Sequence, residues 1–94
     1  MTDCKHYKIK ISGKVQGVWF RKYTHDTAQE LGLKGFVMNQ TDGSVYVEVE
    51  DDNPVKLDEF IHWLHKGSPL SKVDKVEILE EKDCEGYTGF EIRR

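Results

Sequence analysis

The spacing of apolar residues changes period several times along this chain, and that order limits the folds open to it. Apolar and polar residues alternate over 7–12, the period of a strand with one face in a core. Over 20–31 the apolar residues recur at helical spacing instead, and Gly32 stands where a helix C-terminal glycine belongs. A sheet and a helix must therefore share one core.

The same two periods return in the second half of the chain. Thr41-Asp42-Gly43 supplies hairpin turn chemistry between two strand patterns, and Asp52 or Asn53 can cap a second helix. The segments that these patterns predict are strands at 35–38 and 45–49, a helix from Pro54 to near Gly67, and strands at 73–79 and 90–92.

The predicted order is βαββαβ plus a short C-terminal strand, an α+β arrangement. It is the ferredoxin-like split βαβ pattern, in which right-handed crossovers place two helices on one face of an antiparallel sheet. A chain of 94 residues is the size of one ordinary domain, so we expect a single domain over 1–94.

Composition limits the partners. The chain has 14 basic and 17 acidic residues, a net charge of −3, which gives no general attraction to nucleic acid or to anionic membranes. No apolar run approaches the roughly 20 residues of a membrane span, and the polar start lacks the apolar stretch of a secretory signal. We therefore expect a cytoplasmic monomer with no nucleic-acid or membrane partner.

The cysteines and histidines give no metal-site spacing. Cys4 and Cys84 have no C-x-x-C pairing, and in a cytosol we expect free thiols. A bridge under oxidising conditions stays open, because the strands carrying them could be neighbours. His62 and His65 lack a third ligand at a suitable spacing, and His6 is expected merely to lie near a mobile chain end. We predict no metal and no cofactor.

The stretch from Gly13 to Arg21 contradicts ordinary helix chemistry. The first turn of a helix has unpaired N–H groups and a partial positive charge, so it disfavours cations, yet here it carries Arg21 and Lys22. An anion between them would remove the conflict, and arginine can donate two parallel hydrogen bonds to a phosphate. The residues alone leave two interpretations open, a phosphate-binding loop or a glycine-containing turn before a surface arginine.

Several motifs along the chain share one resemblance. They are Gly13, Val15-Gln16-Gly17-Val18 and Phe20-Arg21, then Gly35-Phe36-Val37-Met38-Asn39 and Asp42-Gly43-Ser44-Val45, and finally Gly67-Ser68-Pro69 and Gly89-Phe90-Glu91-Ile92. Together they resemble the acylphosphatase family over nearly the whole chain. The resemblance implies a ferredoxin-like sheet, which agrees with the order of the periods. It also implies hydrolysis of the carboxyl–phosphate bond of small acyl phosphates, with inorganic phosphate as a product.

The resemblance also implies roles for individual residues. In that family the signature arginine binds phosphate together with the loop amides, and the asparagine after the second strand positions the attacking water. These catalytic roles fall on Arg21 and Asn39. The implied phosphate-binding loop consists of Gln16, Gly17, Val18, Trp19, Phe20 and Arg21.

Two residues beside this site depart from the family pattern. Trp19 stands where many members carry glycine, and Met38 stands where a polar or basic residue is frequent. A bulky side chain cannot freely adopt positive φ, so the loop would be distorted if it needed that conformation at Trp19. We expect a tuned affinity and not a lost one.

The implied chemistry needs little machinery. The leaving carboxylate has a conjugate acid of pKa about 4, so it departs without a general acid or a metal. An amide such as Asn39 can orient a water, although asparagine is also favoured for backbone reasons at a strand end before a turn. Nothing in the sequence forms an obvious pocket for the acyl part, so we expect broad specificity.

A second class of function uses the same fold. A non-catalytic module that binds phosphate or carbamoyl phosphate, or that regulates a larger protein, would also explain an anion-binding loop. The short chain favours the freestanding enzyme.

Overall fold

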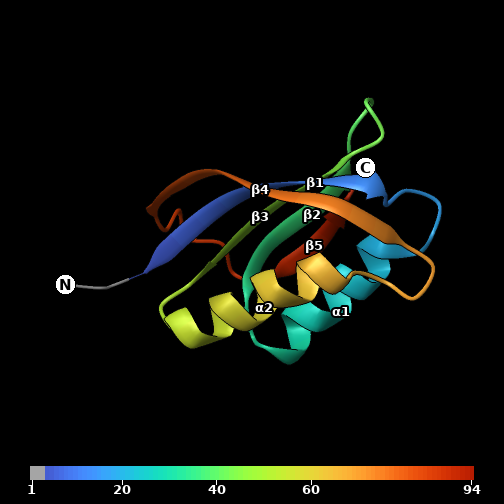
Figure 1. Ribbon diagram of the computed structural model, residues 1–94. Coiled ribbons are helices and arrows are strands. Elements are labelled where there is room, and N and C mark those ends of the chain that lie inside the picture. Colours follow the sequence, from blue (N-terminus) through green and yellow to red (C-terminus); the bar gives the residue numbers. More distant parts are fainter. Residues whose placement is uncertain (1–3) are drawn as a thin grey trace.

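In the part of the chain that the structure describes, five strands form one sheet, and two helices cover one of its faces (Figure 1). The structure, a computed structural model, describes residues 4–94. Its elements are β1 (Lys5–Lys14), α1 (Phe20–Glu30), β2 (Lys34–Asn39), β3 (Val45–Asp51), α2 (Pro54–Lys66), β4 (Lys72–Asp83) and β5 (Phe90–Arg93). The predicted βαββαβ order with a C-terminal strand is confirmed.

The strand order in the sheet is β4-β1-β3-β2-β5. The pairings of β1 with β3 and β4, and of β2 with β3, are antiparallel as predicted. β5 instead runs parallel to β2, with Phe90 opposite Gly35, so the sheet is mixed at that edge. After β4 the chain crosses from one edge of the sheet to the other at the end where β2 begins, so β5 runs opposite to β4 and in the same direction as β2.

The core lies between the sheet and the helices. Alternate residues of the central strands point into it, and the helices contribute the stripes that the helical spacing predicted. Asn53 caps α2, since its side chain accepts hydrogen bonds from the N–H groups of Val55 and Lys56. The largest fully buried apolar side chains are Phe20, Phe60, Ile9, Ile11, Leu57 and Leu64.

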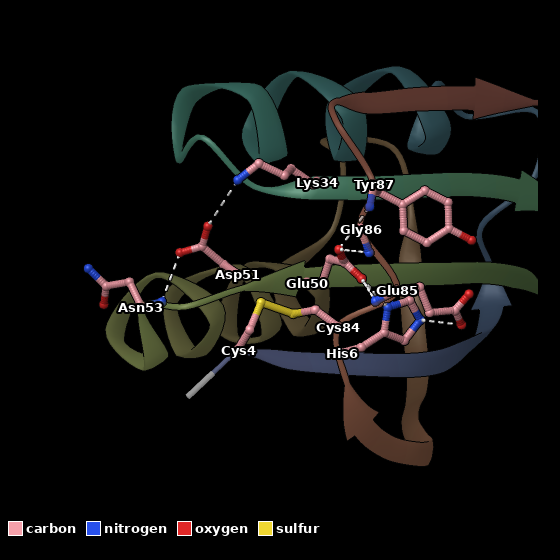
Figure 2. Close-up of a disulfide and its surroundings, with 10 residues drawn as sticks. All are labelled: Cys4, His6, Lys34, Glu50, Asp51, Asn53, Cys84, Glu85, Gly86 and Tyr87. Carbon is pink, nitrogen blue, oxygen red and sulfur yellow. Dashed lines mark hydrogen bonds and ion pairs between the residues drawn. A yellow bond between two sulfur atoms is a disulfide. The ribbon is translucent and has the colours of Figure 1, made fainter. Parts of the chain in front are cut away.

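Cys4 and Cys84 form a disulfide (Figure 2), so the expectation of free thiols was wrong. Their Cα atoms lie 5.5 Å apart because Lys5 and Asp83, the residues just inside them, pair across β1 and β4. This is the neighbouring-strand arrangement that had left a bridge open.

His6 is fully buried, and the expectation that it merely lies near a mobile end was also wrong. It faces the side of the sheet away from the helices, opposite Glu50 on β3. The segment 84–87 folds back over this part of the sheet and covers the histidine (Figure 2).

Across residues 4–94, no helix is both long and apolar enough to span a bilayer.

Candidate functional site

A pocket of about 440 Å³ opens at the N-terminal end of α1. Three segments distant in sequence form it: the loop from β1 into α1, the end of β2, and the C-terminal end of the chain. Its lining residues are Val15, Gly17, Trp19, Phe20, Arg21, Lys22, Asn39, Ile92 and Arg94. The structure therefore brings Arg21 and Asn39, both predicted from the sequence, to one cavity.

The six predicted loop residues divide into two groups. Gly17, Trp19, Phe20 and Arg21 line the pocket. The side chain of Gln16 turns away and donates hydrogen bonds of 2.7 Å to the backbone oxygens of Gln40 and Ser44.

Val18 belongs with Gln16 among the residues that hold the loop from behind. Its side chain is buried, and its carbonyl accepts a hydrogen bond of 2.9 Å from Ser68 Oγ. The loop is thereby attached to the β2–β3 turn on one side and to the segment after α2 on the other.

Trp19 has a left-handed backbone, with φ of 61° and ψ of 18°. Within residues 4–94 it is the one non-glycine residue with positive φ. The loop thus needs a positive φ at Trp19, a conformation that glycine adopts more easily. The tryptophan adopts it at a cost of about 1–2 kcal/mol. The indole is 69% exposed, so the strain is not offset by burial of the ring.

The electrostatics around Arg21 favour an anion. No acidic residue lies in the first turn of α1, and no side chain among residues 4–94 caps the helix. Lys22 is neutralised by Asp26, with Nζ and Oδ2 2.9 Å apart. Arg21, in contrast, makes no ion pair with any residue between 4 and 94 and donates only a long hydrogen bond of 3.3 Å to the carbonyl of Arg93. Its charge stands uncompensated beside the positive end of a helix.

Asn39 ends β2 and is half-buried. Its Oδ1 atom is fully buried and accepts no hydrogen bond from the part of the chain that the structure describes. An acceptor buried in this way costs about 1–3 kcal/mol when it stays unsatisfied. A donor inside the pocket would remove that cost.

A second polar cluster surrounds His6 (Figure 2). Nδ1 lies 2.7 Å from Glu50 Oε1, and Nε2 lies 2.7 Å from Glu48 Oε1. Glu50 also accepts hydrogen bonds from the N–H groups of Glu85, Gly86 and Tyr87. The cluster contributes no residue to the lining of the pocket.

Within residues 4–94, His6, Glu48 and Glu85 could offer ligand atoms to a metal ion, since these atoms lie within 4.8 Å of one another. Both ring nitrogens of His6 already lie within hydrogen-bonding distance of carboxylates, so the cluster is connected without a metal ion. Sequence reasoning missed it. The signal was present in the parity of the strands, because His6 and Glu50 face each other across β1 and β3.

Comparison with known proteins gives a consistent result. The model of the family Acylphosphatase matches residues 7–92. The acylphosphatase of Thermotoga maritima is 44% identical over 89 residues, which are 95% of this chain and 97% of that protein.

Solved structures agree with the sequence relatives. The crystal structure of acylphosphatase from Bacillus subtilis superimposes with a TM-score of 0.91 at 34% identity, covering 96% of this chain and 99% of the other. Full-length HypF, solved in a phosphate- and nucleotide-bound form, has a TM-score of 0.84 at 29% identity. There the match covers all of this chain but 12% of the other.

Proposed function

The chain belongs to the acylphosphatase family of acyl phosphate hydrolases, and we propose that Arg21 and the loop amides bind the substrate phosphate while Asn39 positions the attacking water. One observation carries this proposal. Arg21 and Asn39, from α1 and the end of β2, line the same pocket, and each lacks a strong partner among residues 4–94.

The phosphate half of the proposal rests on charge. The N–H of Tyr23 donates to the carbonyl of Trp19, the residue just before α1, over 3.1 Å. The N–H groups that precede Tyr23 at the start of the helix therefore have no intrahelical acceptor. These donors and the guanidinium of Arg21 lie at the same end of α1. A phosphate there accepts from both, and the planar fork of arginine matches two of its oxygens.

The water half rests on the buried oxygen of Asn39. A water in the pocket can donate to Oδ1, which fixes its position relative to a phosphate held by Arg21. Phosphoryl transfer needs mainly such positioning and stabilisation of charge on the phosphoryl oxygens. Because a carboxylate is a good leaving group, neither a general acid nor a metal ion is required by this mechanism.

Hydrolysis of benzoyl phosphate with a chelator present tests the assignment. We expect Arg21→Ala and Asn39→Ala each to lower kcat/KM by about 10²–10³, the usual effect of losing one positioned polar group. Arg21→Ala also loses binding of inorganic phosphate, whereas Asn39→Ala keeps it. Arg21→Lys is the matched control that keeps the charge and removes the fork, and we expect it to restore little activity.

Three results would contradict the proposal. Full activity in Asn39→Ala would remove the water-positioning role, and loss of wild-type activity with the chelator would remove metal independence. A wild-type chain that binds phosphate without turnover would instead favour the binding module, a role for which the likeness to part of the larger HypF gives some support.

A further inference from the structure

Trp19 combines two unfavourable features at the edge of the pocket. Its backbone is left-handed, a conformation that is strained for any residue with a Cβ atom. Its indole is 69% exposed to water. Strained residues of this kind persist at functional sites, where the strain serves the site and not the fold. The observation therefore calls for a functional role.

The described structure gives the indole no packing role. The ring is absent from the core cluster and from the half-buried residues packed against it, although its neighbours Val18 and Phe20 belong to that core. Phe20 packs with Trp63, at a ring separation of 5.8 Å, so the aromatic contact at this end of α1 does not involve Trp19. Stability alone does not account for the residue.

The pocket itself has more room and more apolar surface than a phosphate needs. Its volume of about 440 Å³ is in the range of small-molecule sites, roughly 300–1,000 Å³. Ile92, 42% exposed, is a second exposed apolar residue of the lining, and none of the Asp or Glu residues between 4 and 94 lines the pocket. The cavity thus offers positive charge for a phosphate and an exposed apolar surface beside it.

We propose that Trp19, with Ile92, forms the wall against which the acyl group of the substrate packs, and that the enzyme prefers acyl phosphates with an aromatic or other large apolar acyl group. The inference rests on the proposed function of the pocket, in which Arg21 binds the phosphate. It differs from the sequence-based expectation of broad specificity, which arose because no acyl pocket could be recognised. An aromatic acyl group that packs on the indole buries apolar surface, and the two rings can adopt the favourable offset-stacked or edge-to-face arrangement.

The test compares two substrates in the same variants. For benzoyl phosphate relative to acetyl phosphate, we expect Trp19→Gly to lower the ratio of kcat/KM values about tenfold, the upper part of the range for one aromatic pair. The change falls mainly on KM for benzoyl phosphate, because an acyl wall binds substrate and transition state alike. Trp19→Phe recovers most of the ratio. Tyr23→Ala, which removes an exposed aromatic residue of α1 outside the pocket lining, leaves it unchanged.

Binding of non-hydrolysable analogues separates this inference from the proposed function. Calorimetry with benzoylphosphonate and acetylphosphonate measures the acyl preference without turnover. Tighter binding of benzoylphosphonate that is lost in Trp19→Gly supports the acyl wall even if the wild-type chain does not hydrolyse acyl phosphates. An unchanged substrate ratio in Trp19→Gly, or equal losses for both substrates and both analogues, overturns it, because Trp19 would then act only through the loop backbone.

Discussion

Replacing Glu50 with glutamine tests how far one buried carboxylate stabilises this fold. Glu50 is 2% exposed, and its two oxygens accept from His6 Nδ1 at 2.7 Å and from three backbone N–H groups at 2.8–3.0 Å. Glutamine keeps the shape but replaces one acceptor oxygen with an NH₂ donor. Two of the four hydrogen bonds are then lost, because each oxygen accepts two of them. The new NH₂ group faces the two donors that had bonded to the replaced oxygen.

The size of the effect follows from those contacts. A hydrogen bond to a charged group contributes about 1.5–3 kcal/mol, so losing two lowers the free energy of unfolding by about 3–6 kcal/mol. His6 also loses one of its two carboxylates while it stays buried. A chain of this length has about 5–15 kcal/mol in total, so Glu50→Gln should be marginally folded.

Urea unfolding followed by circular dichroism measures the difference. Glu81→Gln is the control, because Glu81 pairs with Lys5 at the surface and its loss should change the midpoint little. A loss below about 1 kcal/mol in Glu50→Gln would refute the reasoning, since it would mean that water replaces the two lost hydrogen bonds.

The pH dependence gives an independent check of the same carboxylate. Burial raises the pKa of Glu50, but the hydrogen bonds from Glu85, His6, Gly86 and Tyr87 outweigh it and leave the pKa below its usual 4.5. The stabilisation is therefore complete above about pH 4.5 and is lost as the pH falls through the lower folded-state value. The gap between wild type and Glu50→Gln should narrow below pH 4.5, and a constant gap would contradict this assignment.

Two further predictions concern stability. Cys4→Ser should lower the free energy of unfolding by up to about 4.5 kcal/mol, because the disulfide closes a separation of 80 residues in the unfolded chain. An equal melting temperature with and without reductant would contradict it. Trp19→Gly should raise the free energy of unfolding by about 1 kcal/mol, since relief of the left-handed strain exceeds the added chain entropy. Urea midpoints decide this, and a destabilised variant would show that the indole contributes packing.

Local sequence patterns were sufficient to predict the strands and helices, because the apolar residues of each element recur with the period of that element. Over residues 45–49, β3 alternates buried valines with half-buried residues, and α2 has both a capping asparagine and Pro54 at its start, so neighbouring signals agreed. The predicted bounds of these strands and helices differ from the observed ones mainly at the ends. At those ends, backbone pairing between strands continues beyond the last apolar residue of the strand. β4, for example, continues to Asp83.

The disulfide depends on the register of β1 with β4, in which Lys5 pairs with Asp83. The burial of His6 could not be read from the sequence, because it depends on where the segment 84–87 goes after β4. That path is a tertiary feature, and no period encodes it. The pocket was predicted in part. The cation at the start of α1 indicated an anion site, but the contribution of Ile92 and Arg94 required the parallel pairing of β5 with β2, which brings the end of the chain to the site.

The outer strand β4 has a consequence for how two copies of this chain meet. It is an edge of the sheet, 12 residues long, and eight of those residues are charged. Its pairing with β1 shifts register at two places, between Lys8 and Ile9 and between Ser12 and Gly13. Charges and such irregularities are the features that hinder edge-to-edge growth of sheets. The longest open edge of the molecule is thus a poor template for fibril formation.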